Sequence, residues 1–179
     1  YTYTELKELA FQFNFDNVRD ITSETILTFF NNYGFDTGNK LTEFFKSLIH
    51  RKLGVSQGDI TFKDLYDLTG YTLIITGTCL NNQKAEFFSH ITTPNMEVIT
   101  AIRISISLPI LFQPVKMNDL IYIDGGVTCN FPIKLFKNKL DRTVGIILHS
   151  QKNKQKNEVN GIDQFLMNIY KCVVPDTYR

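Results

Sequence analysis

The stretch with the clearest chemical potential is IYIDGGVTCNFP, residues 121–132, in which an apolar run ends at Asp124 and two glycines follow. A carboxylate that is held at a strand end and shielded from bulk water can accept a proton from a hydroxyl nucleophile. Gly125 and Gly126 would let another segment approach that carboxylate closely, and Asn130 and Pro132 would fix the path of the chain beyond it. An ordinary strand-to-loop turn also fits, because Asp bonds nearby N–H groups and glycine accepts positive φ.

Other side chains of this region carry reactive groups. Ser105 and Ser107 have hydroxyls, but neither lies in a G-x-S-x-G turn, so we expect both to bond to backbone near a helix end. Arg103 is expected to have a structural role, through hydrogen bonds to the Asp-Gly-Gly loop, and the alternative is a surface position without such a role. We expect His90 to be a hydrogen-bonded polar residue at a strand end and Cys129 to pack rather than react.

Composition restricts the class of protein. The chain has 179 residues, 43% of them hydrophobic, which suits one globular domain over residues 1–179. The formal net charge of +1 does not favour a nucleic-acid partner. No apolar run reaches the roughly 18 residues of a membrane span, and no signal peptide precedes the first helix. We therefore expect a location in the cytoplasm or at the periphery of a membrane.

Cysteine and histidine spacing predicts neither a metal site nor a disulfide framework. Cys79, Cys129 and Cys172 lie far apart, without a CxxC pair. His50 and His90 show no HExxH spacing, and neither does the third histidine, His149. We expect no metal and no cofactor.

The elements that must position Asp124 follow from apolar periodicity. Helices are predicted over 2–13, 24–33, 41–53, 61–70, 95–106 and 162–172, and a further helix is predicted to begin at Pro132. Buried strands are predicted over 72–78, 85–90, 120–124 and 143–149. Residues 152–160 are predicted to form a solvated basic loop. Helices interleaved with buried strands predict a layered α/β fold, with a largely parallel sheet flanked by helices. In such sheets ligands bind at the carboxyl ends of strands, where Asp124 is placed.

A wider pattern surrounds Asp124. The segment FFSHITTPNMEVITAIRISISLPILFQPV, residues 87–115, followed by YIDGGVTCNFPI, residues 122–133, resembles the patatin-like phospholipases. That family carries A-x-R-x-S-x-S-x-P-x-x-F-x-P-V shortly before Asp-Gly-Gly. The corresponding residues here are Ala101, Arg103, Ser105, Ser107, Pro109, Phe112, Pro114 and Val115, then Asp124, Gly125 and Gly126. The resemblance runs from about Thr61 to Phe136, and the helical first third carries no diagnostic motif.

The resemblance implies a lipid acyl ester hydrolase with a Ser–Asp dyad, in which Asp124 matches the base and no histidine takes part. It implies phospholipid or acylglycerol substrates, no metal, and peripheral contact with a lipid surface. Aromatic residues of the first third are candidates for a lid, although core packing explains them equally well: Phe11, Phe13, Phe29, Phe30, Phe44 and Phe45.

The sequence departs from the family pattern where the nucleophile belongs. Only Gly34 and Gly38 have the G-x-S-x-G spacing, in GFDTG, where Asp36 takes the serine position and a helix is expected before it. No glycine-rich oxyanion segment is found either. We expect the chain to be the C-terminal portion of the family's domain, incomplete at its N-terminus and inactive by itself.

Loss of the nucleophile by descent would instead make this chain an inactive lipid- or protein-binding module on the same fold. Truncation has a physical consequence as well. A missing central strand would expose strand edges such as residues 72–78, so we expect the isolated chain to be poorly soluble or molten.

Overall fold

The computed structural model describes residues 1–55 and 59–147, and the single residues 161, 165 and 168. Its α-helices are α1 Tyr3–Gln12, α2 Ser23–Leu27, α3 Phe29–Asn32, α4 Asn39–Leu53, α5 Phe62–Thr69, α6 Val98–Ser105 and α7 Gly126–Cys129. Three short 3-10 helices are η1 Phe15–Val18, η2 Ile133–Phe136 and η3 Leu140–Arg142. The strands are β1 Gly34–Asp36, β2 Ile75–Cys79, β3 Lys84–Phe88, β4 Ile110–Phe112, β5 Val115–Met117 and β6 Leu120–Asp124.

Helices α1, α4 and α5 follow the predicted boundaries closely. α1 begins after Thr2, whose hydroxyl and the Glu5 carboxylate form a capping box. α5 begins after Thr61 in the same way and ends at Gly70, in the left-handed region with φ 70°. The helix predicted over 24–33 is divided into α2 and α3, because Thr28 leaves helical geometry and its hydroxyl donates to the Glu24 carbonyl.

The strands form two sheets. The larger has the order β3-β2-β6-β5 with three antiparallel pairings, and the smaller is the parallel pair β1–β4. The layered α/β class is confirmed, although the larger sheet is antiparallel where we expected mostly parallel strands. Loop length explains the difference: residues 80–83 join β2 to β3 and Asn118-Asp119 join β5 to β6, and such short loops connect only antiparallel neighbours.

Other differences concern the middle and the end of the chain. The strand predicted over 72–78 is observed as β2 Ile75–Cys79, which pairs with β3 along its length and with β6 at Gly77–Cys79, so its edges are covered there. Residues 72–74 form no strand. Residues 143–147 form no strand, and Val144 and Ile146 are exposed; residues 148 and 149 lie outside the described residues. The chain at Pro132 enters the 3-10 turn η2 rather than an α-helix. The predicted loop 152–160 and nearly all of helix 162–172 also lie outside the described residues.

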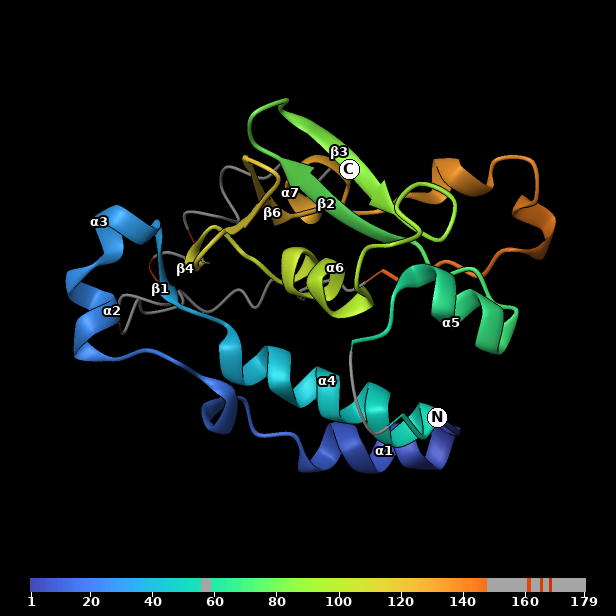
Figure 1. Ribbon diagram of the computed structural model, residues 1–179, viewed down its shortest axis with the longest axis horizontal. Helices are drawn as coiled ribbons and strands as arrows, with labels where there is room; N and C mark the ends of the chain where they lie inside the picture. Colours follow the sequence, from blue (N-terminus) through green and yellow to red (C-terminus); the bar gives the residue numbers. More distant parts are fainter. Residues whose placement is uncertain (56–58, 148–160, 162–164, 166–167, 169–179) are drawn as a thin grey trace, which may run out of the picture.

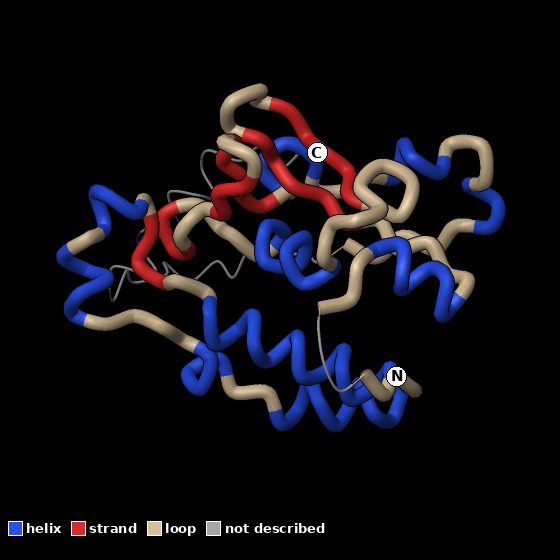
Figure 2. Tube along the Cα trace, in the orientation of Figure 1, coloured by secondary structure: helices blue, strands red, loops and turns tan. Residues whose placement is uncertain are grey.

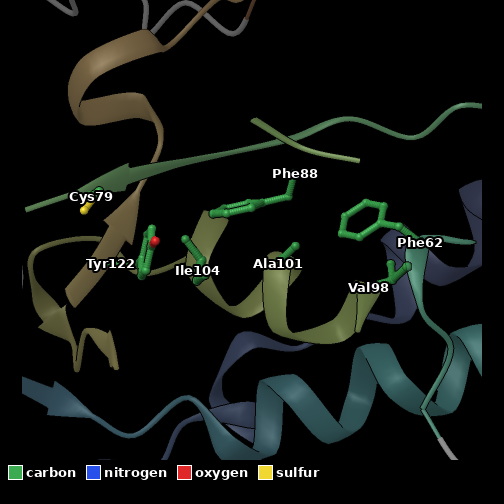
Figure 3. Packing of buried hydrophobic residues seen from close by; sticks show 7 residues of the cluster. All are labelled: Phe62, Cys79, Phe88, Val98, Ala101, Ile104 and Tyr122. Atoms are coloured by element: carbon green, nitrogen blue, oxygen red, sulfur yellow. The ribbon is translucent and has the colours of Figure 1, made fainter. Parts of the chain in front are cut away.

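The elements stack in layers around α6. Figures 1 and 2 show α6 between the larger sheet and α4, with α1 beyond α4. Seven buried residues fill the space between α6, α5 and the sheet (Figure 3): Phe62, Cys79, Phe88, Val98, Ala101, Ile104 and Tyr122. A Cβ at Gly77 of β2 would lie 2.6 Å from Ile104 Cγ2, so the helix packs directly on the strand backbone. This contact fixes the end of α6 relative to β6 and Asp124.

Candidate active site

Asp124 is the last residue of β6, and its backbone is held from two sides. In the register of the sheet it lies opposite Gly77 of β2. Its carbonyl accepts a hydrogen bond of 2.8 Å from the hydroxyl of Thr78, which is 2% exposed. Its N–H donates to the carbonyl of Ser107 at 2.9 Å. Both bonds come from residues distant in sequence, so the carboxylate stands at a well-defined point of the fold.

The carboxylate of Asp124 is half-buried. Its Oδ1 accepts a hydrogen bond of 2.7 Å from the amide of Gly126. Burial raises the pKa of the Asp124 carboxyl above its ordinary value, and the Gly126 hydrogen bond opposes that rise in part. A carboxyl group with a raised pKa is a stronger proton acceptor once ionised, which suits general-base chemistry.

Neither glycine has a positive φ, and the two differ in how closely their neighbours approach. Gly125 has φ −62°, a value open to any residue, but a Cβ there would lie 2.5 Å from the Thr76 carbonyl oxygen. At Gly126 a Cβ would lie 3.1 Å from Asp124 Oδ1 and 3.2 Å from Asn130 Oδ1. The close approach expected at this position is therefore made by β2 backbone at Gly125 and by two side-chain oxygens at Gly126.

Asn130 and Pro132 follow the short helix α7, which was not predicted. The side chain of Asn130 lies near the same point as the Asp124 carboxylate, as its distance to the Gly126 position shows. Asn130 is exposed, so its amide is open to a ligand. Pro132 is the N-cap residue of η2 and turns the chain away from the site.

Arg103 does not reach Asp124 directly. Its guanidinium donates to the Thr37 carbonyl at 2.6 Å, to the Gln113 carbonyl at 2.8 Å and to the Ser107 hydroxyl. Ser107 is fully buried, and its hydroxyl donates to the Arg103 carbonyl at 2.7 Å. Ser107 is therefore not available as a nucleophile, and Ser105 is the last residue of α6.

His90 packs against an aromatic ring, and Cys129 is half-buried. The His90 ring stacks on Tyr66 of α5, with centroids 3.9 Å apart and planes 6° from parallel. Its Nδ1 is buried without a hydrogen-bond partner in the described part of the chain, so the hydrogen bonding predicted for His90 does not form at that atom. Cys129 is a half-buried free thiol at the end of α7.

The G-x-D-x-G segment, residues 34–38, follows helix α3 as expected, and its first three residues form strand β1. β1, a turn at Thr37-Gly38 and helix α4 follow one another as in a nucleophile turn. Asp36 itself is 2% exposed, and its carboxylate accepts the N–H groups of Gly38 at 2.7 Å and Asp20 at 2.9 Å. Both oxygens are thus occupied in holding the backbone, and Asp36 has no place in nucleophilic chemistry.

Two hydroxyl residues near Asp124 were missed by sequence reasoning. The Thr78 hydroxyl bonds the Asp124 carbonyl and also lies 2.8 Å from the Thr128 hydroxyl of α7. Threonine is an ordinary strand residue, so Thr78 in TLIITGT gave no signal of this role. Only the register of β2 against β6 brings it to the site.

The surroundings of the site hold few other chemical groups. In residues 1–55 and 59–147 no cluster of three His, Cys, Asp or Glu side chains suited to a metal ion is found. Over the same ranges, no helix has the length and hydropathy that crossing a bilayer requires.

Comparison with known proteins places these features in a family. A sequence model of the patatin-like phospholipases matches residues 2–137, including the first third that carries no diagnostic motif. The chain is 35% identical to probable lipid hydrolase 463L of Invertebrate iridescent virus 6 over 120 residues, which are 67% of this chain and 38% of that protein. It is 32% identical to uncharacterized protein R571 of Acanthamoeba polyphaga mimivirus over 146 residues, which are 82% of this chain and 47% of that protein.

The chain thus spans less than half the length of either relative. The family match nevertheless covers most of its residues, the helical first third and the Asp-Gly-Gly strand end alike. The chain belongs to the patatin-like phospholipase family.

Proposed function

We propose that this chain supplies the base, Asp124, of a Ser–Asp dyad that hydrolyses lipid acyl esters. The carboxylate takes the proton of a serine hydroxyl as that oxygen attacks the acyl carbon. The proton then passes to the leaving alkoxide, and an acyl-serine remains. In the second half Asp124 takes a proton from water as the water oxygen attacks the acyl carbon. It then returns that proton to the serine oxygen as the acyl–serine bond breaks and the fatty acid leaves. The serine is expected from a G-x-S-x-G turn that the 179 residues do not contain.

One observation carries this proposal: the position of Asp124. The carboxylate stands at a strand end, with one oxygen bound to Gly126 N–H and its pKa raised by burial. Its backbone is bonded on both sides, which fixes the point of the sheet from which the carboxylate extends. These features suit a dyad base, since proton transfer depends on geometry and a raised pKa makes the ionised carboxylate a stronger proton acceptor.

The substrates we propose are phospholipids or acylglycerols, met at a lipid surface by a protein in the cytoplasm or peripheral to a membrane. Family membership and the name of the iridescent virus relative, a probable lipid hydrolase, support a lipid ester. Apolar side chains of α1 to α3 support surface contact, because Phe11, Leu27 and Phe30 are each more than 80% exposed.

The test compares ester hydrolysis by two proteins. One is the 179-residue chain, and the other is a longer version that also contains the residues encoded upstream of Tyr1. We expect the extended version alone to cleave a phospholipid or a short-chain ester. Asp124→Asn should reduce kcat by about 10²-fold or more, the range for loss of a general base. Asp119→Asn, in the exposed β5–β6 turn, is the matched control and should leave kcat unchanged. Full activity of Asp124→Asn would contradict the proposal.

A second function rests on the absence of the serine motif. The G-x-D-x-G segment places a buried carboxylate where a nucleophile would stand. An inactive lipid- or protein-binding module would keep the fold without the chemistry. Vesicle binding by an extended version that hydrolyses no ester would favour this alternative.

A further inference from the structure

Asp124 occupies a place in the sheet that lacks a strand on one side. β5 pairs with β6 only from Met117–Leu120 to Val115–Tyr122, so its ladder stops before Asp124. The N–H of Asp124 would point at that gap, yet it donates to the Ser107 carbonyl at 2.9 Å. A single peptide group between α6 and β4 thus takes the place of the missing strand.

The direction of that peptide group is set by the Ser107 side chain. The Ser107 hydroxyl donates to the Arg103 carbonyl, one helical turn earlier, and accepts from the Arg103 guanidinium. The Ser107 amide donates to the Ile104 carbonyl at 3.0 Å. The Ser107 carbonyl shares its planar peptide group with the Leu108 N–H, which donates to the Ile106 carbonyl at 2.9 Å. Together with the bonds of the Ser107 hydroxyl and amide, this contact fixes the direction in which the carbonyl meets Asp124.

Arg103 anchors this arrangement to the other half of the molecule. Its guanidinium also bonds the Thr37 carbonyl in the β1–α4 turn and the Gln113 carbonyl after β4. A Cβ at Gly38 would lie 2.5 Å from Arg103 Nε, so the guanidinium lies against bare backbone. A guanidinium offers several directed donors in one plane, whereas a lysine ammonium is a compact point charge.

We propose that Arg103 and Ser107 form a clamp that positions Asp124, with Arg103 acting through Ser107 and Ser107 through its backbone carbonyl. This inference rests on the proposed role of Asp124 as base. It makes both side chains positioning residues, since neither is placed to touch the reacting atoms. It also gives the Arg and second Ser of the A-x-R-x-S-x-S run a shared task that their spacing alone does not show.

The first test is amide hydrogen exchange at single-residue resolution on the 179-residue chain. The variants are Arg103→Met, Arg103→Lys, Ser107→Ala and the double variant Arg103→Met/Ser107→Ala. The reference is the amide of Leu80, which donates to Ile121 in the same sheet. We expect Asp124 to exchange about tenfold faster relative to Leu80 in each single variant, with no further gain in the double variant.

Two comparisons separate positioning from general loss of structure. Arg19→Met removes an exposed arginine that pairs with Asp16 and should leave the Asp124 to Leu80 ratio unchanged. Arg103→Lys keeps the charge, so failure of lysine to restore slow exchange assigns the effect to the fork geometry. Equal acceleration of Asp124 and Leu80, or no change at Asp124, would overturn the clamp.

The second test uses the extended version that hydrolyses esters. Arg103→Lys and Ser107→Ala should lower kcat by about 10- to 100-fold with KM unchanged, because a small displacement of a base affects the reacting geometry and not substrate binding. If KM changes and kcat does not, the clamp fails while the proposed function stands. If no version hydrolyses ester but the local exchange result holds, the proposed function fails and the clamp holds a non-catalytic Asp124.

Discussion

The amide of Gly126 donates a hydrogen bond of 2.7 Å to Oδ1 of Asp124, two residues earlier in the chain. This bond stabilises the ionised carboxyl, while burial disfavours it more strongly and raises the pKa of Asp124. The folded chain therefore binds this proton more tightly than the unfolded chain does. Stability from this group is fully present below the ordinary Asp pKa of about 4 and is lost as pH rises through the raised folded value.

Asp124→Asn should accordingly stabilise the fold at neutral pH while it removes the proposed base. The Asn side-chain oxygen can still accept the Gly126 N–H, and no charge has to be buried. We expect a higher melting temperature than for the unaltered chain at about pH 7, and convergence of the two near pH 3, below the ordinary Asp value. Thermal unfolding across this pH range measures the effect, with Asp119→Asn as the charge control. A lower melting temperature at neutral pH would contradict this sign.

Gly125→Ala and Gly126→Ala should differ sharply in their effect on stability. At Gly125 the new Cβ would lie 2.5 Å from a backbone oxygen of β2, which cannot move without disturbing the sheet. We expect a loss of about 2 kcal/mol or more, typical of overpacking in a fixed environment. At Gly126 the contacts are side-chain oxygens at 3.1 and 3.2 Å, which can shift, so stability should change little.

Denaturant titration of the two alanine variants tests this difference. Gly126→Ala should also move the Asp124 carboxylate. In the extended version we therefore expect kcat to fall although the free energy of unfolding changes little. Equal midpoints for the two variants would show that the contact with Thr76 is not the reason for Gly125.

Asp119→Gly should stabilise the β5–β6 hairpin. Asn118 and Asp119 have φ of 49° and 61°, so both central residues of this two-residue turn are left-handed. Asn-Gly is the preferred pair for such a turn, and glycine relieves the Asp119 strain, worth about 0.5–1 kcal/mol. Asn118→Ala should act in the opposite direction, because alanine tolerates positive φ less well. Urea unfolding of both variants is the measurement, and destabilisation by Asp119→Gly would refute the turn assignment.

The unaltered chain should lose stability at alkaline pH because the buried phenol of Tyr122 ionises, and Tyr122→Phe should not show this loss. Burial and the hydrogen bond to Glu86 raise the pKa of Tyr122 to about 12, and its side chain is 3% exposed. The unfolded phenol ionises near pH 10, so stability is complete below that pH and falls as pH rises toward 12. The loss amounts to about 2–3 kcal/mol at full effect.

Chemical unfolding between about pH 9 and 12 compares the two proteins. The difference between them should change with pH over this interval, because only the unaltered chain carries the buried phenol. Parallel curves would show that Tyr122 ionises equally easily in both states.

Leu27→Gln together with Phe30→Gln should increase solubility. Both side chains are more than 80% exposed on α2 and α3, beside exposed Ile26 and Tyr33. An apolar surface of this kind favours self-association. Exposed substitutions cost about 0.5 kcal/mol or less, so the melting temperature should hold while sedimentation shifts toward monomer. If self-association is unchanged, another apolar surface, such as the one with exposed Val144 and Ile146, is responsible for it.

Sequence reasoning worked where one local signal determines the structure. Apolar periodicity located α1 and α5, and the apolar run LIYID located β6 with its Asp124 end. It failed where distant partners decide. The helix predicted over 24–33 breaks at Thr28, and residues 143–147 form no strand although their sequence is β-branched. Periodicity reports which face can be buried, and a strand also needs a neighbour with which to pair.

The site divides in the same way. Asp124 and the glycines stand out because motif spacing and strand-end position are local features. Thr78 and the Ser107 carbonyl do not, because they reach Asp124 only through sheet register and through the geometry at the end of α6. Backbone groups leave no mark in side-chain identity, so the acceptor that holds the Asp124 N–H is invisible in the sequence.

The strand order β3-β2-β6-β5 also has a consequence for the order of events during folding. β2–β3 and β5–β6 are hairpins with short loops, which can each form early because little chain entropy is lost. The β2–β6 pairing joins them across more than forty residues, as the Thr78–Asp124 bond shows, and we expect it to form late. Apart from Gly126, every residue found to bond Asp124 precedes it in the chain, so a growing polypeptide would have these partners available before the carboxylate leaves the ribosome.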